Sequence, residues 1–181
     1  VNLSFVALLN NDVDCGVAGA TISSSEVIRS SIRVIGIKNK VDVLSSSFFM
    51  LSNDLKKKFT YSDCAVIPEP TTKQFCSIAY EAACSHEILS GEQAKVVFLS
   101  FSTKGSADHY KVKKIQDAYE FFAKKHPEII CDGELQFDSA VNSVIANEKN
   151  ANHILNGDAN VFIFPDLDSG NIAYKVTQHL G

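Results

Sequence analysis

Three junctions in this chain share one design: an apolar run of strand length ends in small polar residues and glycine, and a helical pattern follows. The polar stretches are STKGSA (102–107), DGELQ (132–136) and DLDSGN (166–171). In an open α/β sheet, ligands bind outside the carboxyl ends of the strands, where turns of this kind cluster. The sequence therefore predicts a parallel sheet with a ligand-binding cleft built from several loops.

The composition is that of a soluble globular protein, because 45% of the 181 residues are hydrophobic and 21% are charged. This length is enough for one domain with a full core, or for one domain and a fragment of another. The net charge is −4, and the lysine clusters lie beside acids or on helical patterns. We therefore expect solvated lysine faces and no nucleic-acid partner.

The cysteine and histidine patterns exclude several classes of site. The five cysteines are odd in number and include no CxxC pair, which favours reduced, mostly buried thiols in a cytosolic protein. The five histidines include no HxxH or HExxH spacing, so we expect no metal site. No apolar run approaches the roughly 20 residues of a membrane span, so we expect no membrane partner and a cytoplasmic location.

The amino-terminal part of the chain reads as the end of a helix over residues 1–12 and a short buried strand over 16–20. A hydroxyl among residues 21–25 is expected to cap the helix that follows. Two strand-like runs come next, at 41–51 and 59–67. The Ser-Asn-Asp turn and the lysines between them predict an antiparallel pair.

After the prolines near residue 70, helical and strand patterns alternate strictly. The predicted elements are a helix from 70 to about 89, a strand at 95–101, a helix at 108–125, a strand at 129–137, a helix at 138–147, a strand at 160–164 and a helix at 169–180. Such alternation predicts βαβ units and hence an α/β fold, a three-layer α/β/α arrangement with a mostly parallel sheet. Residues 147–158 are expected to be a surface connection.

The first junction has the groups of an anion-binding turn: backbone amides, hydroxyls and an ammonium at a helix amino terminus. Its candidate residues are Ser102, Thr103, Lys104, Gly105 and Ser106. The alternative is an ordinary turn in which Ser106 or Asp108 caps the next helix. The GxxxxGK[ST] phosphate-binding pattern is absent.

The other two junctions carry carboxylates. Asp132 and Glu134 flank a glycine and are suited to acid–base work, to metal binding or to accepting bonds from substrate hydroxyls. A charged strand end with a glycine bulge explains them equally well. In the third junction we expect Asp168 or Ser169 to be the helix N-cap. Asn171, in the first turn, slightly favours a binding role.

Arg29 and Arg33 lie one helical turn apart and share a face, from which an arginine is able to reach a bound phosphate. The alternative is that both are surface arginines. Cys64 has no histidine near it in sequence, so a buried strand thiol is favoured over a nucleophile. Taken alone, these residues predict an α/β domain that binds anions, and they do not identify a reaction.

At these stretches the sequence resembles the phosphate acetyltransferases (phosphotransacetylases). The segments LSFSTKGSA, DGELQFDSA and ANVFIFPDLDSGNIAYKVTQ resemble signature segments of that family, in order and at suitable separations. GVAGATISSSEVIRSSIRVI and FFMLS…FTYSDCAVIPEPT extend the resemblance over essentially the whole chain. The regulatory domain of bacterial malic enzymes has similar strands but usually lacks these three segments, and phosphate butyryltransferases share the GN-I-YK segment but not the Ser-Thr-Lys-Gly-Ser loop.

This resemblance implies a fold like that of isocitrate and isopropylmalate dehydrogenases, in a homodimer with two α/β domains and the active site between them. Residues 1–38 would be a remnant of the first domain, and residues 39–181 would be the second. The implied reaction is reversible transfer of an acetyl group between coenzyme A (CoA) and phosphate, by base-promoted attack of the CoA thiol on acetyl phosphate. CoA is then a substrate, and no metal or bound cofactor is needed.

The resemblance also implies roles for individual residues. Arg29 matches an arginine that binds the substrate phosphate, and Ser23 and Ser24 match the Ser-Thr pair before it. The residues implied to face the substrates are Ser23, Ser24, Arg29, Ser102, Thr103, Lys104, Gly105, Ser106, Asp132, Glu134, Asp166, Gly170, Asn171 and His179. His179 replaces an arginine that contacts CoA, which makes such a contact weaker or dependent on pH.

No catalytic residue is implied within the chain, because the family's catalytic serine, arginine and aspartate lie in a segment beyond the GNIAYK helix. We therefore expect this chain alone to be inactive. The alternative hypothesis is a non-catalytic domain that senses acetyl-CoA or mediates assembly, as at the carboxyl terminus of bacterial malic enzymes.

Overall fold

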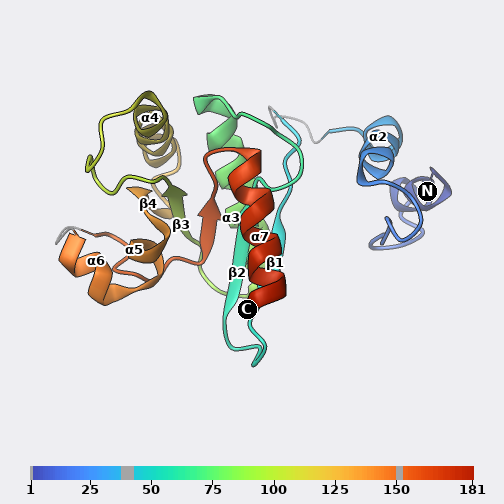
Figure 1. The fold of residues 1–181 in the computed structure, drawn as a ribbon. Helices are drawn as coiled ribbons and strands as arrows, with labels where there is room; N and C mark the ends of the chain where they lie inside the picture. The colour runs from blue at the N-terminus through green and yellow to red at the C-terminus, as the bar shows by residue number, and fades with distance from the viewer. Residues whose placement is uncertain (1, 38–42, 150–152) are drawn as a thin grey trace. The chain divides into compact units, whose positions relative to one another are not determined.

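The computed structural model describes residues 2–37, 43–149 and 153–181 (Figure 1). The chain divides into two compact units, Val1–Val41 and Asp42–Gly181. The domain boundary that the sequence predicts, between residues 38 and 39, lies outside the described residues.

The smaller unit contains two helices, α1 (Asn2–Leu9) and α2 (Ser24–Val34). Ser23 is the N-cap of α2, and its side-chain oxygen accepts a bond of 3.3 Å from the Glu26 amide, so the expected hydroxyl cap is confirmed. The strand predicted at 16–20 is wrong, because these residues are exposed and have no strand conformation. A strand needs a hydrogen-bonded partner, and residues 2–37 contain no second strand.

The larger unit contains a five-stranded sheet in the order β1-β2-β5-β3-β4 (Figure 1). The strands are β1 (Phe48–Leu51), β2 (Lys58–Ser62), β3 (Lys95–Leu99), β4 (Ile130–Leu135) and β5 (Val161–Ile163). β1 is antiparallel to β2, as predicted, and the other neighbours are parallel. β2 is shorter than its predicted range, because the amides of residues 65–67 donate to the Asp63 side chain instead of to a neighbouring strand.

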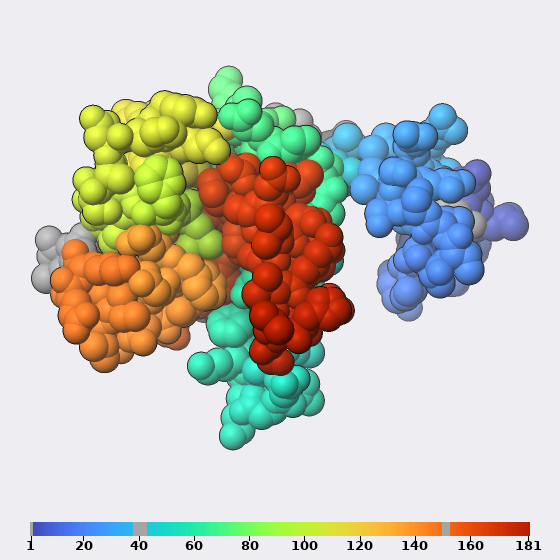
Figure 2. Space-filling model, in the orientation of Figure 1, coloured from blue at the N-terminus to red at the C-terminus, as the bar shows by residue number. Residues whose placement is uncertain are grey.

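Helices cover both faces of this sheet. They are α3 (Thr72–Ser90), α4 (Tyr110–Lys125), α5 (Phe137–Val141), α6 (Ser143–Lys149) and α7 (Leu167–Leu180). Because side chains alternate along a strand, Val96 and Phe98 of β3 pack with α3 and α4, whereas Val97 and Leu99 pack with α5 and α7. The predicted α/β fold with a mostly parallel sheet is confirmed. The space-filling view shows α7 lying across one face of this unit (Figure 2).

Two helix caps differ from the sequence prediction. His109, and not Ser106 or Asp108, is the N-cap of α4, and the Ser106 hydroxyl instead accepts the Thr103 amide. Asp166 is the N-cap of α7, one turn earlier than expected, and its carboxylate accepts the Ser169 amide at 2.9 Å. Each helix therefore begins where a side chain is free to accept an amide, which sequence pattern alone does not identify.

The first turn of α7 lies against the turn that follows β2. A Cβ atom at Gly170 would come within 2.6 Å of the Asp63 carbonyl oxygen and 3.0 Å of the Cys64 sulfur. The Asn171 side-chain amide donates to the Cys64 carbonyl at 3.1 Å. The Gly-Asn pair of the third junction therefore joins α7 closely to the end of β2.

We predict that Gly170→Ala destabilises the protein, although glycine-to-alanine changes inside helices ordinarily stabilise by about 1 kcal/mol. The added methyl group overlaps backbone and sulfur, so we expect a loss of about 2 kcal/mol or more. Urea unfolding measures this free energy, with Ile172→Ala on the exposed side of the same helix as the control. An unchanged or raised stability of Gly170→Ala would contradict the close contact.

Candidate functional site

The three junctions singled out in the sequence lie on three adjacent strands of the sheet: two follow a strand, and residues 132–136 form the end of β4 itself. β5, β3 and β4 are neighbours and run parallel, so the turns after them lie at one edge (Figure 1). Residues 102–106 follow β3, and residues 166–171 follow β5. The predicted assembly of these loops at the carboxyl edge is confirmed.

Glu134, near the end of β4, organises the loop that follows β3. Its side chain is buried, and one carboxylate oxygen accepts the Ser102 hydroxyl at 2.8 Å and the Gly105 amide at 2.7 Å. Its backbone carbonyl accepts the Lys104 amide at 3.0 Å. These donors compensate the buried charge, and they fix the loop against β4.

Asp132 makes a second connection between β4 and the same loop. Its fully buried carboxylate accepts the Lys104 ammonium and the Gly133 amide on one oxygen, and the Ile154 amide, at 2.9 Å, on the other. Lys104 also donates to the Gly133 carbonyl at 2.8 Å. The lysine of the predicted anion site is therefore already paired inside the protein.

The backbone amides of the loop are also engaged. From Ser102 to Ala107 each amide donates to a protein acceptor: Ser100 Oγ, Ser106 Oγ, Glu134 O, Glu134 Oε1, Thr103 O and Ser102 Oγ, in order. The expectation that these amides lie open to an anion is wrong, because the acidic residues of β4 and the loop's own hydroxyls accept them. Gly105 and Ser106 are nevertheless exposed, so the outer surface of the loop is accessible.

His153 is a residue of this region that the sequence interpretation missed. Its side chain is buried, and Nδ1 lies 3.5 Å from the second oxygen of Asp132. Burial lowers its pKa, although the Asp132 carboxylate acts in the opposite direction. The surface connection predicted for 147–158 is therefore wrong at His153 and at the buried Leu155. The sequence did contain one indication of burial here, the apolar pair Ile154-Leu155 in an otherwise polar stretch.

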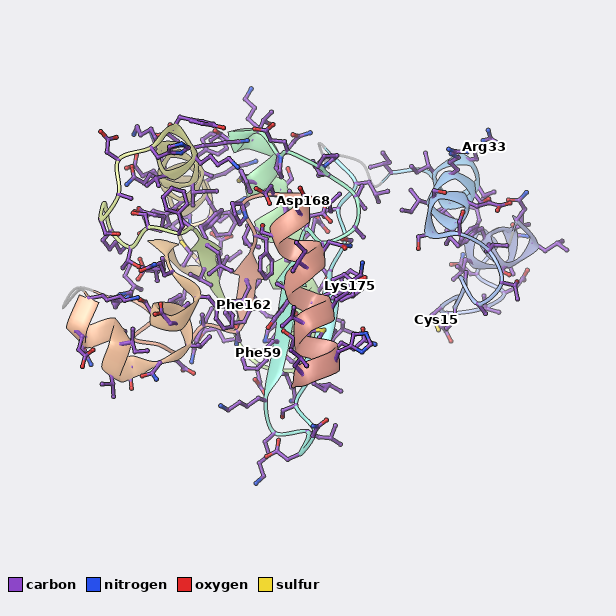
Figure 3. All side chains as sticks on the ribbon, viewed as in Figure 1. Cys15, Arg33, Phe59, Phe162, Asp168 and Lys175 are labelled. Atoms are coloured by element: carbon purple, nitrogen blue, oxygen red, sulfur yellow. The ribbon has the colours of Figure 1, made fainter. Side chains whose placement is uncertain are left out.

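The third turn is centred on Asp166. Burial opposes its ionisation, but bonds from Ser169 and the Lys111 ammonium, 3.7 Å away, outweigh burial and hold the pKa of Asp166 below its usual range. A cleft of about 310 Å³ lies here between α4 and α7, with Lys111, Lys114, Asp166 and Asp168 among its lining residues. Figure 3 labels Asp168 at the start of α7.

Several predicted site residues belong to the smaller unit, lie at the far end of α7 or are engaged elsewhere. Ser23, Ser24 and Arg29 are exposed residues of the smaller unit. His179 is in the last turn of α7, about 18 Å along the helix from its start at 1.5 Å per residue. The Asn171 side chain is engaged at both ends: its amide nitrogen donates to the Cys64 carbonyl, and its side-chain oxygen accepts a bond of 2.7 Å from the Lys175 ammonium. Figure 3 labels Lys175 on α7.

The thiols agree with the sequence prediction in most cases. None of the five cysteines, all of which lie in the described residues, forms a disulfide; Cys64, Cys76 and Cys131 are buried, whereas Cys15 is exposed. Burial raises the pKa of Cys64 to about 12 and that of Cys131 to about 11, with neighbouring aspartates adding to the effect. Both remain protonated at neutral pH, which disfavours a nucleophilic role.

Over residues 2–37, 43–149 and 153–181, no helix is both long and apolar enough to cross a bilayer. In the same ranges, His, Cys, Asp and Glu side chains form no group of three or more that could hold a metal ion.

We predict strong coupling between Lys104 and Asp132. Removing one partner leaves a buried charge uncompensated, so Lys104→Met and Asp132→Asn should each lower the free energy of unfolding by about 3 kcal/mol. The double variant should lose at least about 1 kcal/mol less than the sum. Lys111→Met, which removes an exposed partner of Asp166, is the control and should cost about 1 kcal/mol or less. Additive losses in urea unfolding would show that the pair does not hold the loop.

Almost the whole amino-acid sequence matches one family model. Residues 2–181 match the model described as phosphate acetyl/butaryl transferase. A phosphate acetyltransferase of Staphylococcus aureus is 41% identical over 169 residues, which cover 91% of this chain and 51% of the relative. The phosphate acetyltransferase of Bacillus subtilis is 38% identical over 165 residues, with 91% of this chain and 50% of the relative covered. The chain therefore spans about half the length of these curated relatives.

Solved structures give the same result. The EutD phosphotransacetylase from Staphylococcus aureus matches with a TM-score of 0.88 and 38% identity, covering 99% of this chain and 55% of that one. A phosphotransacetylase from Streptococcus pyogenes matches with a TM-score of 0.87 and 32% identity, covering 99% and 54%. A branched-chain phosphotransacylase from Enterococcus faecalis, at 20% identity and a TM-score of 0.71, shows a similar fold.

Proposed function

Because the chain belongs to the phosphate acetyl/butaryl transferase family, we propose that the protein carrying it transfers an acetyl group between CoA and phosphate. The reaction is acetyl-CoA plus phosphate giving acetyl phosphate plus CoA, and it is reversible. CoA serves as a substrate, and no resident metal or other cofactor takes part.

The main support for this proposal is that two of the signature turns lie at the same edge of the sheet. Residues 102–106 and 166–171 follow neighbouring parallel strands, where α/β proteins bind their ligands. Lys111 and Lys114 of α4 line the same cleft as Asp166, and a bound phosphate would compete there with their acidic partners, Asp166 at 3.7 Å and Glu69 at 3.2 Å. A substrate with several phosphates is attracted to such cations, particularly where they lie at a helix amino terminus.

We assign different roles to the predicted site residues. Asp132 and Glu134 are buried and bonded to the loop after β3, so we assign them a positioning role: they hold the loop surface that faces the substrate. Exposed Gly105 and Ser106 are then the loop residues that touch substrate. Exposed Arg29, preceded by Ser23 and Ser24 at the start of α2, supplies the bidentate cation for the phosphate of acetyl phosphate.

We also propose that the protein is cytoplasmic, that its fold is like that of isocitrate dehydrogenase, and that residues 1–38 and 39–181 contribute to different domains. A homodimer is proposed as the working form. Its support is an apolar groove of about 860 Å³, lined by residues of the edge strand β1, including Phe48 and Leu51, and by Tyr174 of α7. An edge strand presents unpaired backbone groups, and a second copy would cover them.

The proposed activity is tested by thioester formation from acetyl phosphate and CoA, using the protein that carries this chain. Arg29→Ala should raise the KM for acetyl phosphate roughly tenfold or more, since a charged hydrogen bond is lost. Arg33→Ala, one turn further along the same exposed face, is the matched control. The 181-residue chain is assayed in parallel.

Either of two results would overturn the proposal. Absence of turnover in the protein carrying the chain, with acetyl-CoA still bound, would favour the sensing or assembly domain. Equal effects of Arg29→Ala and Arg33→Ala would remove the specific phosphate role of Arg29.

The proposed dimer is tested by sedimentation equilibrium on the same protein. We expect Leu51→Lys, which places a charge at the half-exposed end of β1, to shift the mass from dimer to monomer. Ile88→Lys, at an exposed position near the end of α3, should leave the mass unchanged. A monomeric parent protein would contradict the dimer directly.

A further inference from the structure

Three exposed aromatic rings lie directly beside the loop that follows β3. They belong to Phe101, His109 and Tyr110, and we refer to them as the aromatic shelf. Phe101 is 55% exposed and Tyr110 is 68% exposed, and His109 is exposed as well. Large aromatic side chains are usually covered in folded proteins. A group of three exposed rings at the edge of a candidate site therefore indicates a surface that a ligand or another protein covers.

The geometry of the shelf is fixed by local contacts. The ring centroids of Phe101 and His109 are 5.8 Å apart at an angle of 67°, and those of His109 and Tyr110 are 4.6 Å apart at 37°. The His109 ring is oriented by its own backbone, because Nδ1 accepts the Lys111 amide at 3.2 Å. The three rings therefore form one ordered group that joins the loop after β3 to the start of α4.

A cleft of about 320 Å³ adjoins this group. Its lining includes the shelf residues His109 and Tyr110, the exposed loop glycine Gly105, and the polar side chains of Asp108, Lys113 and Gln116. Ligand pockets range from roughly 300 to 1,000 Å³, so this one is large enough for a nucleoside but not for a whole CoA molecule. The combination of two aromatic rings and several hydrogen-bonding groups in one lining suits a heteroaromatic base, and Phe101 lies next to this lining through its contact with His109.

We propose that the aromatic shelf binds the adenine ring of CoA by stacking. The inference rests on the proposed function, and it assigns the nucleotide end of that substrate to the larger unit. The adenine face lies against the rings of Phe101 and Tyr110, and its edge meets the polar side chains of the cleft. The chain of phosphates then extends past Gly105 along the carboxyl edge of the sheet.

Two features favour a purine base over an apolar occupant such as a protein side chain. Bases stack on exposed aromatic faces and retain hydrogen bonds at their edges, and the shelf itself has polar tips at His109 and Tyr110. The cleft also has charged groups of both signs, because Asp108 and Lys113 line it and Lys113 is paired with Asp117 at 2.7 Å, so hydrogen bonding to the base edge and not net charge is what the cleft offers. An apolar protein contact would leave the polar groups of the cleft without partners.

The test is titration calorimetry with CoA and with pantetheine, which lacks the nucleotide. The variants are Phe101→Ala and Tyr110→Ala, with Phe101→Tyr and Tyr110→Phe as ring-preserving versions. Phe121→Ala, at a partly exposed aromatic position on the outer side of α4, is the matched control. We expect each shelf alanine variant to bind CoA about tenfold more weakly, because one base–aromatic stack is lost. Pantetheine binding should not change.

The possible results separate the two proposals. If the unsubstituted protein that carries this chain binds neither CoA nor pantetheine, the proposed function fails and the shelf assignment fails with it. If the parent binds CoA and the alanine variants bind it equally well, only the shelf assignment is overturned. A lowered urea midpoint in Phe101→Ala with unchanged CoA affinity would mean that protein covers the shelf, which also overturns it. Recovery of affinity in Phe101→Tyr supports stacking.

Discussion

The candidate site depends on two buried carboxylates of one strand. Asp132 and Glu134 are charged groups placed beneath the turn that follows β3, where an unpaired charge would be strongly unfavourable. Their donors are the Lys104 ammonium, the Gly105 amide and the Ser102 hydroxyl of that turn, so both carboxylates hold the turn in place. Neighbouring strands are therefore joined at their ends by charge as well as by the sheet ladder, and the outer surface of the turn is held in place.

The same device recurs along the carboxyl edge. After β2, the buried Asp63 carboxylate accepts the amides of residues 46, 65, 66 and 67. After β5, the Asp166 carboxylate caps α7 through the Ser169 amide. Because α7 begins there, Gly170 is placed against the Asp63 turn, and two turns stabilise each other. The turns of this edge are therefore fixed to one another by hydrogen bonds to buried or capping carboxylates.

Much of the fold was predictable from the sequence because alternation of strand and helix is a local property. Most strands and helices of the larger unit lie within a few residues of their predicted positions, and the antiparallel β1–β2 pair followed from its turn. Two predictions differ: β1 begins only at Phe48, and the helix predicted at 138–147 is two helices, α5 and α6. The errors share a cause: each depended on contacts distant in sequence. The predicted strand at 16–20 has no partner, the caps of α4 and α7 were set by other hydrogen bonds, and His153 is buried against Asp132.

The sequence by itself determined the family, the order of elements and the three polar turns that gather at one edge of the sheet, because motif wording and periodicity are encoded residue by residue. Only the tertiary structure decided what each polar side chain does. Lys104, expected to meet an anion, is paired with Asp132, and the amides around it are already bonded. Which donor reaches which acceptor depends on the separation of neighbouring strands in space, and a sequence pattern does not contain that distance.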